Sequence, residues 1–182
     1  MVGKLKSIGF VLFCSVWMAQ VAQADNCRLS VSQSRIDYGV IRQEALVESP
    51  SVALGTRWLQ LNVICAEPST MALRFIGTAD GQGFRFGRQG RFHLRLKHAQ
   101  LDGRTVEWEA AQQPGEAANG QLLPGQTLVA RAAGMPLAGQ RLTAQVEVAT
   151  DLPSDALQVR NETRLEGQGA FELVSPVARP TR

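Results

Sequence analysis

The sequence has few of the residues on which catalysis or metal binding depends. It contains two histidines, His93 and His98, three cysteines and only 6% aromatic residues. It has no Gly-x-Ser-x-Gly nucleophile motif and no His-Glu-x-x-His metal motif. On a continuous strand, two residues five positions apart face opposite sides, so the two histidines are not expected to share a metal. The sequence therefore predicts no enzyme, no cofactor and no metal site.

Strong charge of one sign is also absent. The formal net charge is +3, and two lysines at the amino-terminal end contribute to it. Phenylalanines and arginines interleave between Gly77 and Lys97, a mixture that occurs in proteins that bind single-stranded nucleic acid. A glycine-rich hairpin with its arginines toward water explains this stretch better, and the rest of the chain is nearly neutral. We expect no nucleic-acid partner.

Only the amino-terminal end carries an apolar run of any length. Two lysines precede an apolar stretch from Ile8 to Met18, and Ala22 and Ala24 follow as a small-x-small pair. This order is typical of a cleavable secretory signal peptide. The alternative, an uncleaved anchor, would need about 20 apolar residues. We therefore predict a signal peptide over residues 1–24 and export through the inner membrane.

Removal of that segment would leave two cysteines, Cys27 and Cys65. In an oxidising compartment, two cysteines most simply form one disulfide. Two free thiols or a metal pair are the alternatives, and a metal would need further ligands. Both cysteines are in phase with the apolar positions of their strands, so a bridge between them would lie in the core.

Apolar and polar residues alternate with a period of two along much of the remaining chain, and turn residues such as Asp102 and Gly103 separate the alternating stretches. This pattern predicts an all-β antiparallel sandwich over residues 25–176, followed by a loose tail over residues 177–182. The alternating apolar series are Cys27, Leu29 and Val31; Leu59 to Cys65; Met71 to Phe75; Phe92 to Leu96; Leu142 to Val148; and Phe171 with Leu173.

The segments around the cysteines resemble subunits of chaperone–usher fimbriae, in particular the β-fimbrial branch of bacterial pilins. CRLSVSQSRIDYGVI, from Cys27 to Ile41, is similar to the family's opening strand and its Asp-Tyr-Gly turn. LQLNVIC, at Leu59–Cys65, is similar to the strand that carries the second cysteine. GFRFGRQGRFHLRL, LPGQTLVARAAG and RLTAQVEVAT look like later strands, and RLEGQGAFELV, at Arg164–Val174, resembles the last one. The resemblance depends on the order and spacing of these motifs.

This resemblance implies an immunoglobulin-like sandwich that lacks its final strand. In such subunits, a periplasmic chaperone and later a neighbouring fimbrial subunit fill the open groove with a donated strand, which is a form of β-augmentation. The outer-membrane usher is a further expected partner, and the fimbria at the cell surface is the expected location. Leu29, Val31, Phe171 and Leu173 are expected to line the acceptor groove. The sequence leaves open whether a host or surface receptor is bound.

One departure from the family concerns the segment before the first cysteine. Shaft subunits carry a donor segment of alternating apolar residues there, whereas only Asp25 and Asn26 stand between the predicted signal peptide and Cys27. On this interpretation the chain accepts a strand but donates none. We therefore expect a place at the fibre tip or an accessory role.

The alternative function is a secreted or periplasmic binding module, for example for carbohydrate. Such a module would have a complete sandwich with a self-paired last strand and an exposed aromatic patch. Trp58 and Trp108 are the candidates for that patch, and Trp58 is expected on the face opposite Leu59 and Leu61. Burial under a loop is the alternative for each tryptophan, because tryptophans are largely buried on average.

Overall fold

The structure is a computed structural model that describes residues 26–41, 51–113, 117–157 and 164–174. The segments predicted as signal peptide and tail lie outside these residues. Within them the chain is mostly β-strand, with one short 3-10 helix, η2 (Ser154–Leu157). No helix in the described part has the length and apolar character needed to cross a membrane.

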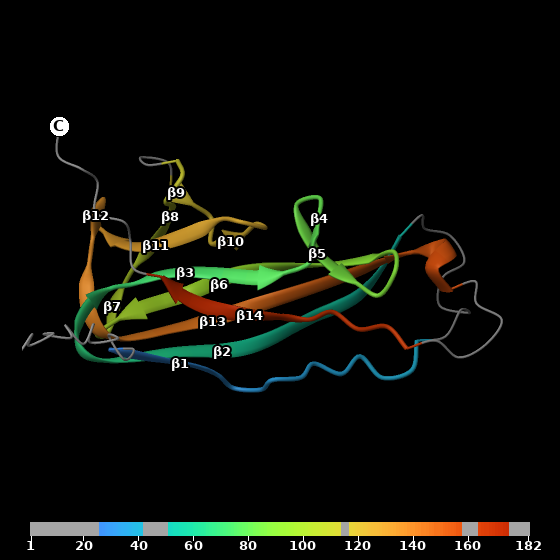
Figure 1. Ribbon diagram of the computed structural model, residues 1–182, viewed down its shortest axis with the longest axis horizontal. Helices are drawn as coiled ribbons and strands as arrows, with labels where there is room; N and C mark the ends of the chain where they lie inside the picture. Colours follow the sequence, from blue (N-terminus) through green and yellow to red (C-terminus); the bar gives the residue numbers. More distant parts are fainter. Residues whose placement is uncertain (1–25, 42–50, 114–116, 158–163, 175–182) are drawn as a thin grey trace, which may run out of the picture.

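The described strands form two antiparallel sheets, a large sheet of eight strands and a small sheet of six (Figure 1). In the large sheet the order is β1-β2-β13-β6-β5-β4, with β7 and β10 also paired to β6; in the small sheet it is β14-β3-β11-β8-β9, with β12 paired to β11. The large sheet contains β1 (Cys27–Val31), β2 (Ser51–Thr70), β4 (Ala79–Asp80), β5 (Gly83–Phe86), β6 (Gly90–Leu101), β7 (Arg104–Thr105), β10 (Gln121–Leu122) and β13 (Ala138–Pro153). The small sheet contains β3 (Ala72–Gly77), β8 (Glu107–Ala110), β9 (Ala117–Ala118), β11 (Thr127–Ala132), β12 (Met135–Pro136) and β14 (Gly169–Val174).

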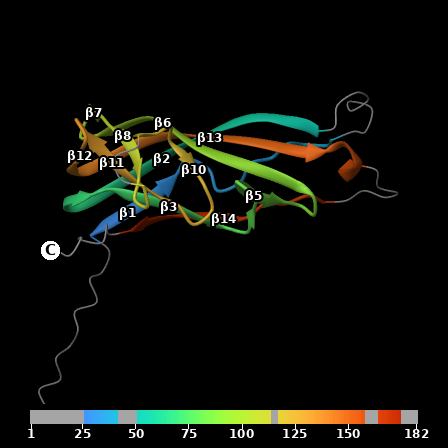
Figure 2. The same cartoon turned by 90° about the horizontal axis from the view of Figure 1, so that it is seen from above.

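Three long neighbouring strands, β2, β13 and β6, form the centre of the large sheet and run along the length of the molecule (Figure 2). Their apolar residues alternate with polar ones, and the apolar set is buried as the sequence predicts. Leu61, Val63 and Val146, for example, have no exposed surface. Because side chains alternate across a strand, one face of the sheet covers the core and the other faces water.

The predicted turns are present where glycine permits a positive φ. Asp102 and Gly103 connect β6 to β7 with φ values of 50° and 78°. Ala133 and Gly134 connect β11 to β12 with φ values of 50° and 77°. Positive φ at both central residues belongs to the type I′ turn, whose twist matches that of the flanking strands.

The two sheets share one core. The chain passes from the large sheet to the small sheet at Met71, whose side chain is fully buried. Phenylalanine rings then join the elements of both sheets: the ring centroid of Phe75 lies 4.7 Å from that of Phe84 and 5.9 Å from that of Phe92. Aromatic pairs of this kind contribute about 0.5–1.5 kcal/mol beyond the burial of their area. Two of these rings, Phe75 and Phe92, border the cavity described in the next section.

The first strand is fixed to its neighbour by a disulfide. Cys27 and Cys65 face each other across β1 and β2, and their sulfurs are 2.06 Å apart. The Asn26 side chain reinforces this end, because its amide donates to Ser69 Oγ at 2.7 Å and its oxygen accepts from the Glu67 amide at 2.9 Å. The prediction of an all-β, immunoglobulin-like antiparallel sandwich with one disulfide is confirmed.

The prediction that the two histidines face opposite sides is wrong. β6 has a bulge, and both Lys97 and His98 point away from the core, with His98 at a φ of 50°. His93 and His98 therefore share the outer face of the large sheet. They meet different partners: His93 Nε2 lies 3.6 Å from Asp151 Oδ1, and His98 Nδ1 lies 3.0 Å from Gln145 Oε1.

Candidate functional site

Two strands, β1 and β14, each form the edge of a sheet. In the described part of the chain, β1 pairs only with β2 and β14 pairs only with β3. A cavity of about 1370 Å³ lies between them, bordered by residues 29–41 on one side and residues 164–171 on the other. In Figure 1 the extended segment that follows β1 runs beside β14. We call this cavity the groove.

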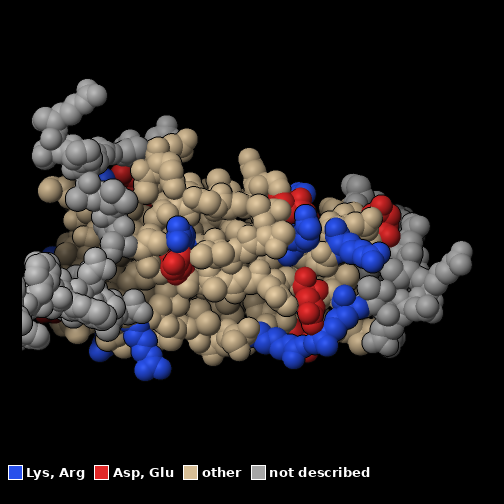
Figure 3. All heavy atoms as spheres, viewed as in Figure 1, with Lys and Arg blue, Asp and Glu red and all other residues tan. Residues whose placement is uncertain are grey.

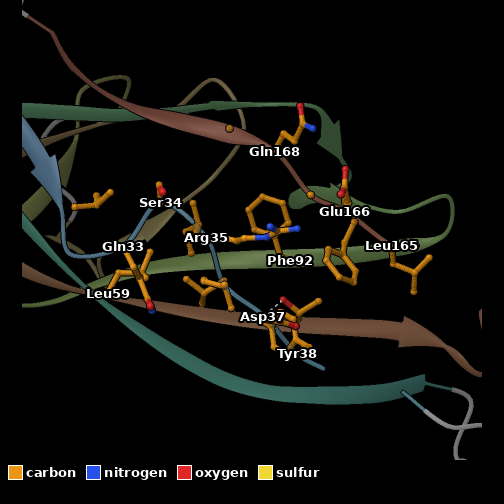
Figure 4. Close-up of a pocket in the computed structure, with 18 of the residues that line it drawn as sticks. Gln33, Ser34, Arg35, Asp37, Tyr38, Leu59, Phe92, Leu165, Glu166 and Gln168 are labelled. Carbon is orange, nitrogen blue, oxygen red and sulfur yellow. Dashed lines mark hydrogen bonds between the residues drawn. The ribbon is translucent and has the colours of Figure 1, made fainter. Parts of the chain in front are cut away.

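The floor of the groove is apolar. It consists of core residues from the long strands and from β3, among them Leu59, Phe75 and Phe92. Figure 4 shows Leu59 and Phe92 in the groove. These three side chains are each 8% exposed, which is the largest exposed fraction among the buried apolar residues. Leu94 and Val148 lie deeper, at 3% and 5%. The core therefore reaches the surface of the groove at these three side chains.

The first wall is β1 together with residues 33–41. The inward side chains Leu29 and Val31 are only half-buried, because the sheet ends at this strand. The ladder between β1 and β2 continues to Ser32, whose amide donates to the carbonyl oxygen of Gln60 at 2.8 Å. Beyond it, residues 33–41 make no backbone–backbone hydrogen bond to any other described residue. Within the described part of the chain, the main-chain donors and acceptors of this segment therefore have no backbone partner.

Side chains hold the far end of the first wall. The Asp-Tyr-Gly turn is present, since the Gly39 amide donates to the Asp37 carboxylate at 2.7 Å and Gly39 has a φ of 69°. The Tyr38 hydroxyl lies 2.8 Å from Thr150 Oγ1, and its ring meets that of Phe86 edge-on with centroids 6.0 Å apart. Tyr38 thus attaches residues 33–41 to β13 and β5.

We expect Tyr38→Phe to lower the free energy of unfolding by about 1–2 kcal/mol, because Thr150 is 3% exposed and would lose its partner. Urea denaturation measures this change. The matched control is Tyr38→Phe combined with Thr150→Val, which removes both polar groups and should recover most of the loss. Equal destabilisation in the single and double variants would contradict the role given to this hydrogen bond.

The second wall is β14 together with residues 164–168, which lead into it. Phe171 borders the groove and packs edge-on against Phe75, with ring centroids 5.0 Å apart. On the outer face, Arg74 Nε donates to the Glu172 carboxylate at 2.5 Å. This hydrogen bond, with the charge of Glu172, raises the pKa of the Arg74 guanidinium. Both contacts join β14 to β3, so the opposite edge of β14 faces the groove without a partner strand among the described residues.

A glycine lets the aromatic floor lie close to this wall. A Cβ added at Gly169 would stand 2.2 Å from Phe75 Cζ and 2.6 Å from the backbone oxygen of Ile76. We expect Gly169→Ala to destabilise the protein by about 1–3 kcal/mol, because the ring and the strand must both move. Thermal unfolding measures the effect, with Ala170→Ser at the exposed neighbouring position as the control. If both variants unfold at the same temperature as the wild type, Gly169 does not make this close contact.

Three of the four residues predicted for the groove border it. Leu29 and Val31 lie on the first wall, and Phe171 lies on the second. Leu173 shares the inward face of β14 with Phe171, but it is half-buried against the core and is not among the residues that border the cavity. The groove thus opens toward the start of β14 rather than along its whole length.

The sequence predicts the groove walls around Arg28–Ile41 and Gly167–Val174, but it singles out no groove residue that lies outside the regular strands. Tyr38 and Ile36 border the cavity from the first wall, and Leu165 borders it from the second. The alternation of Ile36 and Tyr38 with Arg35 and Asp37 is a signal that could have identified the first two. Leu165 is an isolated apolar residue in a polar stretch, and no local pattern marks it.

The two tryptophans that the alternative function would use, Trp58 and Trp108, differ in burial. Trp58 is 46% exposed on the outer face of the large sheet, as the sequence predicts, and Lys97 Nζ lies 5.5 Å from its ring centroid. Trp108 is 4% exposed and belongs to the core. The pair therefore forms no exposed aromatic patch of the kind that the alternative function requires.

The groove combines open main-chain edges with an apolar floor. Such an arrangement can take up an extended peptide, because the edges supply hydrogen bonds and the floor accepts alternate side chains. No cluster of three or more histidine, cysteine or acidic side chains placed to hold a metal occurs in the described residues. The site is therefore an apolar groove between two edge strands of an antiparallel sandwich.

Comparison with solved structures gives a weak likeness. The chain is similar to the P pilus rod subunit PapA, known from a crystal structure, with 14% sequence identity and a TM-score of 0.47. The match covers 82% of this chain and 98% of that chain. No family model matches the sequence, and no curated protein matches it. A likeness of this size indicates neither a family nor a function.

Proposed function

We propose that the groove accepts an extended strand from another protein, and that the chain is a structural, non-enzymatic subunit of a chaperone–usher fimbria. The observation that carries this proposal is the pair of open edges, β1 and β14, on either side of an apolar floor. A periplasmic chaperone would fill the groove first and a neighbouring subunit would fill it later. Export, the outer-membrane usher and assembly at the cell surface belong to the same proposal.

The physical reason for such a partner is the cost of leaving the groove empty. An unpaired strand edge next to exposed apolar side chains is a template for aggregation. A strand inserted between β1 and β14 would pair with both edges and cover Leu59, Phe75 and Phe92. The same insertion would therefore both protect the subunit and join it to a partner.

Peptide binding tests the proposal. The probe is a fluorescent peptide of about 12 residues with valine and threonine at alternate positions, and the control is a peptide of the same composition with its valines grouped together. We expect the alternating peptide to bind and the grouped one to bind at least about tenfold more weakly, because only alternation places the valines on one face. Equal binding of the two peptides would count against a strand-accepting groove.

A pair of substitutions on β1 locates the binding. Leu29→Glu places a charge inside the groove and should abolish binding, whereas Arg28→Glu, on the exposed face of the same strand, should leave it unchanged. Circular dichroism checks that both variants fold, and Leu29→Ala serves as a milder second variant. Binding that falls equally in the two glutamate variants would indicate another site.

The alternative, a binding module with a complete sandwich, has less support. It requires a last strand that is paired on both sides, whereas β14 pairs only with β3 in the described part of the chain. It also requires an aromatic patch, and Trp58 is the only largely exposed aromatic side chain among the described residues.

A further inference from the structure

The groove is charged at one end only. Its bordering residues from β1 and β14 include no charged side chain, whereas both walls carry charges at the end away from the disulfide. Figure 3 shows basic and acidic atoms gathered at that end of the molecule. The charged residues that border the groove are Arg35 and Asp37 on the first wall and Arg164 and Glu166 on the second.

Three of these four side chains are already engaged. The Asp37 carboxylate accepts the Gly39 amide at 2.7 Å, and Arg164 Nε lies 2.6 Å from Glu166 Oε1. Arg35 forms no ion pair with any residue that the structure describes. Its exposed side chain extends over the groove toward Phe92 (Figure 4). Among the charged residues that border the groove, Arg35 is therefore the positive charge that has no ion-pair partner within the described part of the chain.

We propose that the incoming strand carries an acidic residue beside its apolar positions, and that Arg35 binds this carboxylate. The inference rests on the proposed function and adds the chemistry of the partner. Filling the groove removes water from around the guanidinium, which strengthens a charge-assisted hydrogen bond to a carboxylate. A lysine or arginine at the same place would be repelled, so Arg35 selects partners. Because the charge lies at one end, it also sets which end of the strand enters there.

The test uses alternating valine–threonine peptides that differ at one terminal position, with blocked ends. One set carries glutamate, glutamine or lysine at the first position and a second set carries them at the last. For one of the two sets we expect the glutamate peptide to bind about fivefold or more tightly than the glutamine peptide, and the lysine peptide to bind more weakly still. The preference should weaken as the salt concentration rises.

Two variants identify the residue responsible. Arg35→Gln should bind all six peptides with similar affinity, while Arg164→Gln, which removes a positive charge already paired to Glu166, should keep the preference for glutamate. Peptide binding without any charge preference, or a preference that survives in Arg35→Gln, would overturn the role of Arg35 and leave the groove's function standing. No binding by any peptide would overturn both proposals.

Discussion

Replacing Cys27 with serine is expected to lower the free energy of unfolding by about 2–5 kcal/mol. Cys27 is bonded to Cys65, 38 residues further along the chain and directly opposite on β2. The bridge limits the conformations of the unfolded chain, which is the main way in which a disulfide stabilises. β1 also has a single neighbouring strand among the described residues, so little else replaces the bond. The first wall of the groove should loosen with it.

Urea denaturation of the purified protein gives the size of this effect. Ser30→Ala is the matched control, because Ser30 lies on the exposed face of the same strand and should change stability by less than about 0.5 kcal/mol. Mass spectrometry of non-reduced peptides establishes that the bond is present before the comparison. Free thiols on both cysteines, or a Cys27→Ser protein as stable as the control, would contradict the structural role given to the disulfide.

The second large effect is expected when a strand is supplied to the groove by the chain itself. An extension of about 12 alternating valine and threonine residues, attached by a flexible linker, should raise the midpoint of thermal unfolding by about 10 °C, or about 3 kcal/mol for a domain of this size. The gain comes from burying the apolar floor and pairing both open edges. Aggregation should fall at the same time, because the edges are no longer exposed.

The control extension has aspartate in place of each valine. It keeps the length, the linker and the tendency to remain extended, but it cannot enter an apolar groove. We expect its midpoint to equal that of the unextended chain. An extended protein that melts and aggregates like its aspartate control would show that the groove does not take up a strand.

Local patterns in the sequence predict much of this fold. Period-two alternation identifies the buried face of strands such as β2 and β13, because side chains of a strand necessarily alternate between core and water. The turn at Asp102 and Gly103 is equally local, since few residues tolerate a positive φ. The phase of Cys27 and Cys65 with the apolar face predicts a bridge on the core side, and the structure has the bridge, with Cys65 buried and Cys27 partly buried.

The features that the individually predicted residues do not include depend on distant parts of the chain. Tyr38 borders the groove because its hydroxyl reaches Thr150, 112 residues away. The bulge at His98 shifts the alternation of the later residues of β6 by one position. The alternation before His98 gives no sign of this shift. The groove ends before it reaches Leu173. Its extent depends on how β1 and β14 are placed relative to each other, and these strands belong to different sheets.

Amide hydrogen exchange with and without the alternating peptide tests the central claim most directly, because it reports which backbone groups become paired. We predict slower exchange in β14 and in residues 28–41 when the peptide is present, with β8, β9 and β11 unchanged as an internal reference. Unchanged exchange along both walls, or protection confined to another edge such as β4 or β9, would contradict the claim that β1 and β14 bound a strand-accepting groove.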